Sequence, residues 1–233
     1  MSKKFGGNIQ INVERFHFSV RLESIFFPIE LADLVPILEE TGFSVRQELV
    51  EKIPELPIGG RIVAGGVIAE KRAIKQIFRM DPDRGVLTIV GQDINDVIED
   101  FSKVEELVKD KLNVALEKEA RFYEFIAEAS ASTGSDPTKV IAKLYQDSKL
   151  LPEISKIVGY SATNFGVRIV EQNRYVNDAK WFDFRIEPHV PKPNISYHIN
   201  VVYRHPERAN VVQAAISLLE TVEKLISAME QGA

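Results

Sequence analysis

Arginine, histidine and tryptophan side chains recur at alternating positions in four short segments of this chain. A guanidinium group binds phosphate or carboxylate through two parallel hydrogen bonds, and an indole ring offers a flat stacking surface. Such side chains on one surface would suit an anionic or aromatic partner. The candidate binding residues are Arg15, His17, Arg21, Arg168, Arg174, Trp181, Asp183, Arg185, His189, His198 and Arg204.

Three of the four histidines, His189, His198 and His205, lie on two neighbouring predicted strands. Three converging imidazoles would bind a metal ion, but these spacings fit no metal signature. Strand alternation also places His205 on the face opposite His198, and its position before a proline favours a cap or a surface role. We therefore predict no metal, no cofactor and no catalytic residue, with a histidine beside Asp183 or Glu187 as the acid–base alternative.

Several common kinds of site are excluded or disfavoured by composition and motif. The chain has no cysteine, which excludes disulfides, cysteine zinc sites and thiol nucleophiles. Two glycine pairs, Gly59-Gly60 and Gly65-Gly66, flank residues 61–64, but they match neither a P-loop nor a dinucleotide fingerprint. We interpret them as a strand entry and a bulge.

Length, charge and hydropathy are those of a water-soluble protein. The chain has 233 residues, 45% hydrophobic and 27% charged, with a formal net charge of −5. No apolar run approaches the ~20 residues that span a bilayer, and no apolar stretch follows the first basic residues. We expect a cytoplasmic protein that has no membrane partner. The net charge disfavours a general polyanion binder, although a local basic surface is compatible with it.

Hydrophobic periodicity predicts the elements of the first half of the chain. Alternating residues from Ile9 to Leu22 change phase between Val13 and Phe16, which predicts either a strand with a bulge near Glu14-Arg15 or two separate short strands. A helix over 29–41 containing Pro36, and a connecting loop over 45–58, come next. Strands follow over 61–71, 73–80 and 85–90, with a tight turn at 81–85, and then a helix over 94–112 capped by Asp93.

The second half repeats this order. A strand over 121–129 precedes a helix that begins at Ser135-Asp136-Pro137 and a short helix over 151–158 that ends at Gly159. Strands over 164–172, 181–189 and 196–205 follow, and then a long amphipathic helix over 206–229. The apolar stripe of that last helix predicts core packing, with a homodimer seam through this C-terminal helix as the alternative.

The chain therefore reads as two β-α-β-β-β-α halves, with expected boundaries 1–112 and 113–233. Segments 8–24 and 113–130 also share letters: each begins with Asn and a β-branched residue, reaches Arg-Phe-aromatic and ends near Glu and Ser. Consecutive strands favour hairpins, and the helices need an apolar surface to pack on. We predict an α+β fold: two pseudo-duplicated halves forming one antiparallel sheet, with the helices on one face.

This element order resembles the duplicated fold of the TATA-binding proteins. The resemblance covers most of the chain but only as element order, and the family's phenylalanine pairs match no positions here. It implies a sheet with one helix-covered face and one face free to bind, while the fold alone does not imply a function.

The functional prediction is a non-catalytic binding or regulatory protein whose polar sheet face engages an anionic partner. Nucleic acid and an acidic protein surface are the two partners in view. One alternative is an enzyme or small-molecule binder with a pocket between the halves near Arg185, His189 and His198. Another is a protein–protein interaction module. Cross-strand pairing of arginine with acidic residues would explain the same arginine content without any ligand.

Overall fold

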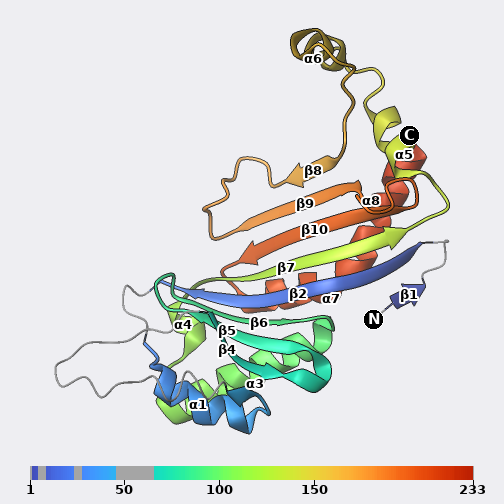
Figure 1. The fold of residues 1–233 in the computed structure, drawn as a ribbon. Coiled ribbons are helices and arrows are strands. Elements are labelled where there is room, and N and C mark those ends of the chain that lie inside the picture. Colours follow the sequence, from blue (N-terminus) through green and yellow to red (C-terminus); the bar gives the residue numbers. More distant parts are fainter. Residues whose placement is uncertain (1, 5–8, 24–27, 46–65, 233) are drawn as a thin grey trace.

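The computed structural model describes residues 2–4, 9–23, 28–45 and 66–232. These residues form one antiparallel sheet whose strand order is β3-β4-β5-β6-β2-β7-β10-β9-β8, and β1 pairs separately with β2 (Figure 1). The predicted loop and glycine pair between 46 and 65 lie outside the described residues. No helix in the described ranges is long and apolar enough to cross a membrane.

Each half of the chain contributes one side of this sheet. The elements of the first half are β1 (Ser2–Lys4), β2 (Gln10–Leu22), α1 (Leu31–Glu40), β3 (Ser44–Val45), β4 (Gly66–Lys71), η1 (Arg72–Ile74), β5 (Gln76–Asp81), β6 (Val86–Gly91) and α3 (Ile94–Leu112). Those of the second half are α4 (Leu116–Glu119), β7 (Ala120–Ser132), α5 (Pro137–Leu144), α6 (Leu150–Val158), β8 (Val167–Val170), β9 (Trp181–Pro188), β10 (Ser196–His205), α7 (Arg208–Ile216) and α8 (Leu218–Gly232).

The two long central strands, β2 and β7, join the halves. Phe18 of β2 pairs with Phe125 of β7, and counting outwards from this pair the strand order is β6, β5, β4 on one side and β10, β9, β8 on the other. The register shifts between Val13 and Arg15, which confirms the predicted bulge. The α+β fold with a duplicated arrangement around one antiparallel sheet is therefore confirmed.

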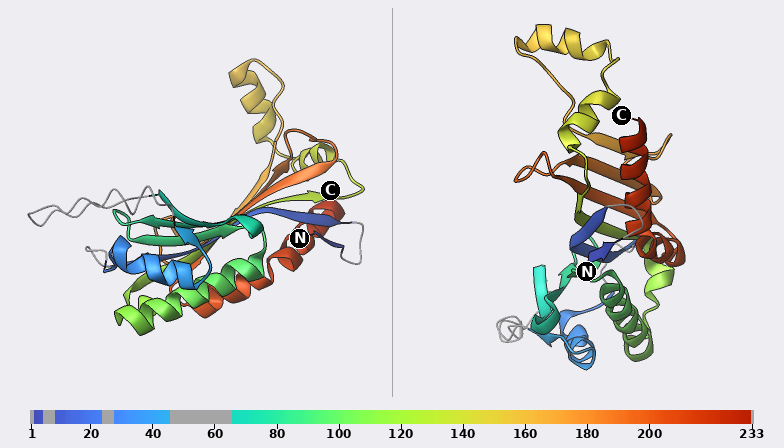
Figure 2. Two further views of the ribbon diagram at one scale, coloured as in Figure 1. Left: turned by 60° about the horizontal axis from the view of Figure 1, so that its bottom comes forward. Right: turned by 90° about the vertical axis from the view of Figure 1, so that its right-hand side faces the viewer.

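Helices α1, α3, α7 and α8 lie on one face of the sheet, as predicted, whereas α6 projects away from it (Figure 2). Period-2 alternation turns the apolar side chains of β2 toward them, and Phe16, Phe18 and Val20 are each 0% exposed. α3 and α8 contribute their apolar stripes to the same core, including Val97 and Val222. On the opposite face, here called the open face, no helix of the described residues is packed.

Local sequence signals placed most of the element ends correctly. Asp93 caps α3 by accepting hydrogen bonds from the backbone N–H groups of Asn95 and Asp96. Asp136 caps α5 in the same way, with Pro137 at its first turn. Gly85 has φ +64° in the turn before β6, and Gly159 has φ +77° at the end of α6.

Two predictions about the helices and the repeat were wrong in detail. The predicted helix over 206–229 is two helices, because Ser217 ends α7 and its hydroxyl donates to the carbonyls of Gln213 and Ala214. The letters shared by 8–24 and 113–130 also occupy different elements: Asn113 is the left-handed C-cap of α3, and α4 precedes β7. The duplication therefore lies in the order of elements.

Candidate binding surface on the open face

Strand pairing brings residues from both halves into single rows on the open face. One row crosses five strands and contains, in order, Arg15, Glu128, Asn200, Arg185 and Arg168. Candidates more than 150 positions apart in the chain thus belong to one continuous surface. Since side chains alternate along a strand, His17, Ser19 and Arg21 lie on this same face.

The arginines of the second half are paired with acidic side chains. Arg168 donates to both oxygens of Asp183, at 3.1 and 2.8 Å, and Arg185 donates to one of them at 3.3 Å. Asp183 is only 4% exposed. Burial alone would raise the pKa of its carboxyl, but the two guanidinium groups hold that pKa below its usual value. Arg168 is therefore bound through two of its nitrogen atoms, while Arg185 gives one nitrogen to the same carboxylate.

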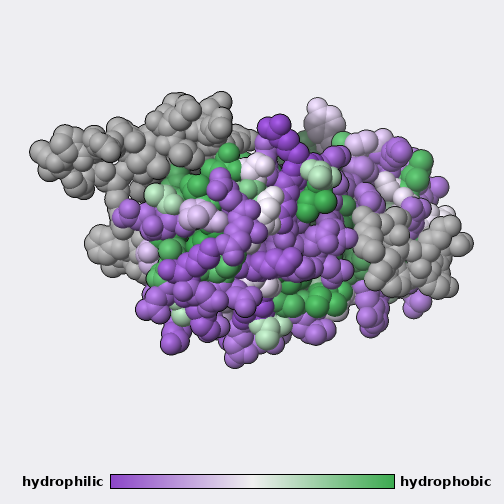
Figure 3. Space-filling model, turned by 90° about the horizontal axis from the view of Figure 1, so that it is seen from below, coloured by the Kyte–Doolittle hydropathy of each residue, from purple (hydrophilic) through white to green (hydrophobic). Residues whose placement is uncertain are grey.

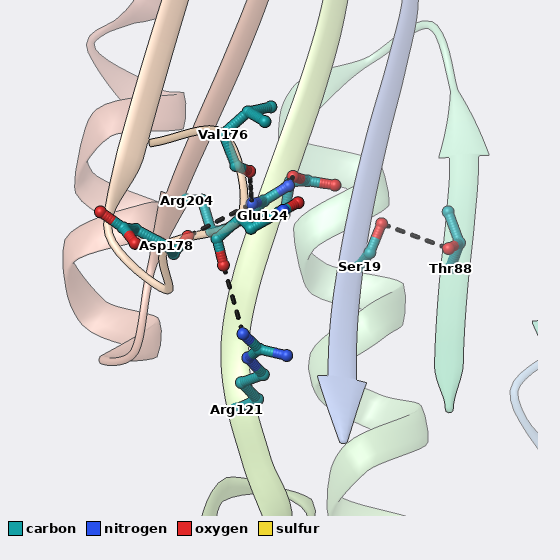
Figure 4. A network of polar contacts seen from close by, with 8 residues as sticks. Ser19, Thr88, Arg121, Glu124, Val176, Asp178 and Arg204 are labelled. Carbon is teal, nitrogen blue, oxygen red and sulfur yellow. Dashed lines mark hydrogen bonds and ion pairs between the residues drawn. The ribbon is translucent and has the colours of Figure 1, made fainter. Parts of the chain in front are cut away.

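Arg204 holds the segment between β8 and β9 over the open face (Figure 4). Its Nε atom donates to Glu124 on β7 at 2.9 Å, and its Nη1 atom donates to the carbonyls of Val176 and Asp178 at 2.7 and 3.2 Å. Arg121 donates to the carbonyl of Asn177 at 3.2 Å. The guanidinium of Arg204 therefore stabilises the fold and is occupied in this structure.

The tryptophan and a neighbouring phenylalanine are also enclosed. Trp181 is 6% exposed and Phe122 is 3% exposed, although strand alternation places both side chains on the open face. The guanidinium carbon of Arg204 lies 4.2 Å from the centre of the Phe122 ring, and that of Arg21 lies 5.8 Å from it. In this structure the indole ring offers no free stacking surface. Arg174 is half-exposed at the edge, with its Nε atom 3.9 Å from Glu171.

Two histidines of the second half form a pair, and the third lies just before α7. The rings of His189 and His198 stack with their centres 6.1 Å apart, and Nδ1 of His189 lies 3.3 Å from the hydroxyl of Ser196. His205 accepts a hydrogen bond from the backbone N–H of Glu207, the residue before α7, at 3.0 Å, so its ring lies at the start of that helix. Among the described residues, no group of three or more histidine or acidic side chains is arranged to hold a metal ion.

On the open face of the first half, three basic side chains lie near one another. We call Arg15, His17 and Arg79 the basic cluster. His17 on β2 pairs with Val90 on β6, and Val90 pairs with Ile77 on β5. Arg79 lies two residues along β5 from Ile77, and so it is diagonal to His17 across one strand.

The basic cluster contains buried nitrogen atoms without partners. Nε2 of His17 and Nε of Arg79 are buried and make no hydrogen bond. Within the described part of the chain, neither Arg15 nor Arg79 has a carboxylate within ion-pair distance, although Glu128 is the residue paired with Arg15. Burial, followed by the charges of Arg15 and Arg79, lowers the pKa of His17 to about 4.

Sequence reasoning identified two members of this cluster and missed Arg79. The signal was present, because Arg79 alternates with Phe78 and Met80, which are 0% and 3% exposed and turn toward the helices. Of the candidate residues, those of the second half are largely paired or enclosed, whereas the buried nitrogen atoms without partners on the open face belong to His17 and Arg79 of the first half.

The comparisons with known proteins extend these observations only in respect of the fold. No family model matches the chain, and no curated protein matches it. Among solved structures, the chain is similar to Methanococcus jannaschii TBP, with 12% sequence identity over 92% of this chain and 98% of that one, at a TM-score of 0.37. At this identity and score the likeness concerns the arrangement of elements alone.

Proposed function

We propose that this protein is a non-catalytic binding or regulatory protein whose open sheet face engages an anionic partner at the basic cluster. The observation that carries the proposal is the pair of buried, unpaired nitrogen atoms on His17 and Arg79 beside the charged Arg15. Buried polar groups are almost always hydrogen-bonded, and an ion bound from outside the chain is one explanation of such an exception.

The chemistry of the cluster favours an oxyanion as that acceptor. Two guanidinium groups supply positive charge and several donors, and a phosphate or carboxylate offers acceptors in matching geometry. His17 is neutral at pH 7 because its pKa is about 4, so its ring supplies a single N–H donor. Glu128 lies across from Arg15 and disfavours anions that approach from the β7 side.

Nucleic acid is the first partner to test, because its phosphates repeat along a strand and the open face extends beyond the cluster. The net charge of −5 restricts such binding to a local contact with few phosphates. The candidate arginines of the second half add to this surface only where their guanidinium groups are not held by acidic side chains and can turn toward the partner. An acidic protein surface is the alternative partner with the same chemistry.

The experiment is fluorescence anisotropy with duplex and single-stranded oligonucleotides over a salt series. We expect affinity to fall with salt, with a log–log slope of about −2 to −3 if two or three phosphates are neutralised. Arg15→Ala should reduce that slope by about one. Arg84→Ala is the matched control, because Arg84 is an exposed arginine at the β5–β6 turn, outside the cluster. Absent or salt-independent binding would rule out the nucleic-acid version.

A second measurement tests the cluster without any nucleic acid. We expect inorganic phosphate to raise the pKa of His17 in an NMR titration, because a bound anion offsets the two arginine charges. An unchanged His17 titration at saturating phosphate would contradict the anion site itself.

A further inference from the structure

Helix α6 is an amphipathic helix without a packing surface in its own chain. Its apolar side chains recur at one helical face, namely Leu150, Leu151, Ile154, Ile157 and Val158. Leu150 is 66% exposed, Ile157 82% and Val158 52%, and none of the helix's residues is buried. Figures 1 and 2 show α6 standing away from the body of the protein, beyond β8. An exposed apolar stripe of this kind marks an interaction surface.

The same half contains an apolar hollow on the helix-covered side of the sheet. The hollow has a volume of about 200 Å³ and is lined by Phe125, Phe182, Phe184, Tyr203, Ala214, Ser217, Leu218 and Thr221. Its volume is below the ~300 Å³ at which ligand pockets begin, so it suits a few inserted side chains better than a small molecule.

The first half shows what normally covers this position. There α1 packs beside α3 and β3, and its residues Leu34, Ile37 and Leu38 are each 0% exposed. β5 and β9 hold corresponding places in the strand order, yet Phe78 of β5 is fully buried while Phe182 and Phe184 of β9 are only half-buried. The second half therefore has an uncovered apolar position where the first half has a helix.

We propose that α6 of a second copy of this chain covers the hollow, so that two copies exchange their α6 helices. The chain's own α6 does not line the hollow, and the elements on both sides of α6 are anchored elsewhere. α5 packs against α8 and β9 on one side, and β8 pairs with β9 on the other. Gly166, immediately before β8, lies so close to Glu187 that an added Cβ would be 2.7 Å from its Cγ atom.

An exchange of this kind is self-complementary. Each copy supplies one amphipathic helix and one hollow, so a two-fold axis relates two identical contacts. Both contacts form in the same dimer, and the interface therefore buries two copies of the nine-residue helix α6. The apolar positions of α6 at 150, 154 and 157 follow the spacing that a helix uses when it enters a groove. The basic cluster takes no part in this contact, so this inference is independent of the proposed function.

The first test is the mass of the protein in solution by light scattering. We expect a dimer of the 26.3 kDa chain whose dissociation constant rises at least tenfold in Ile157→Asp. Because Ile157 is 82% exposed, this substitution leaves the fold of the single chain intact. Lys156→Asp is the control, since it introduces the same residue on the opposite side of α6. It changes the net charge by two units where Ile157→Asp changes it by one, so an unchanged dissociation constant in Lys156→Asp assigns the effect to the apolar face. A wild-type monomer at all concentrations overturns the proposal.

The second test identifies which α6 occupies the hollow. The chain has no cysteine, so a disulfide forms only between introduced residues. Chains carrying Ile157→Cys are mixed with chains carrying Thr221→Cys, and we expect a mixed disulfide of dimer size on a non-reducing gel. Lys156→Cys in place of Ile157→Cys should give at least tenfold less. In the double variant, a disulfide confined to single chains shows that the chain's own α6 closes, and it overturns the exchange; so does the absence of any disulfide.

Discussion

The two halves of this protein leave opposite faces uncovered. In the first half, α1 and α3 bury the helix-covered side of the outer strands, while Arg15 and Arg79 on the open face have no carboxylate partner among the residues that the structure describes. In the second half, the open face is occupied by ion pairs and by the segment held by Arg204, while the apolar hollow stays open on the other side. One element order thus supports two different surfaces.

The segments that join the strands account for this difference. Between β2 and β4 the chain forms α1, which packs beside α3, whereas between β7 and β8 it forms α5 and the detached α6. β4 and β5 are joined by the short η1, but the longer segment between β8 and β9 reaches back to Arg204. Figure 3 shows the first half from the side of α1 and α3, mostly hydrophilic with small hydrophobic areas. The duplicated sheet therefore does not determine which parts of its open face and of its helix-covered face stay uncovered.

The largest expected effect is on core packing in the two halves. Phe78→Ala should lower the free energy of unfolding by about 3–5 kcal/mol, because the ring is fully buried and leaves a cavity. Phe184→Ala should cost about 1–2 kcal/mol, because its ring is half-covered in the single chain. Urea unfolding at low protein concentration measures both.

Protein concentration sharpens this first comparison. If α6 of a second copy fills the hollow, the cost of Phe184→Ala should grow with concentration, while that of Phe78→Ala should not. Equal costs for the two substitutions at low concentration would contradict the view that only the first half is fully covered.

An intermediate effect concerns the open face of the first half. The pKa of His17 is about 4 in the folded chain and 6.5 in the unfolded one, so the unfolded state binds more protons between these values. Stability should therefore fall as the pH falls below 6.5. From pH 7.5 to 5 the loss from this one residue is about 1–2 kcal/mol, reduced from the full shift because the ring is partly exposed.

The variant His17→Gln isolates this contribution, because it removes the one imidazole of the basic cluster and leaves Arg15, Arg79 and Glu128 in place. Urea unfolding at pH 7.5 and pH 5 should show a smaller loss in the variant than in the wild type. His198→Gln is the control, because it removes a histidine from the open face of the second half and leaves the basic cluster intact. An identical pH dependence in the wild type and His17→Gln would contradict the buried, neutral state of His17.

The sequence was sufficient to predict the fold but not to predict which elements cover each face of the sheet. Alternation along β2 and β10 and the 3.6-residue period of α3 predicted one sheet with helices on one side. The apolar stripes of α1 and α6 look alike in sequence, and periodicity reports an apolar side without naming what packs on it. Arg204 likewise reads as a free surface arginine, because its partner Glu124 is 80 positions away.

The smallest effect should be the same in both halves, because helix caps depend on neighbours in sequence. Asp93 accepts from the N–H of Asn95 at 2.9 Å, and Asp136 accepts from the N–H of Thr138 at 3.0 Å. Asp93→Ala and Asp136→Ala should each lower the free energy of unfolding by about 1 kcal/mol, measured by urea unfolding. Asp93→Asn and Asp136→Asn are the controls and should restore most of it, since the amide oxygen can accept the same bond. A cost confined to one half would mean that the halves differ in local structure as well as in coverage, and the joining segments would then explain only part of the contrast.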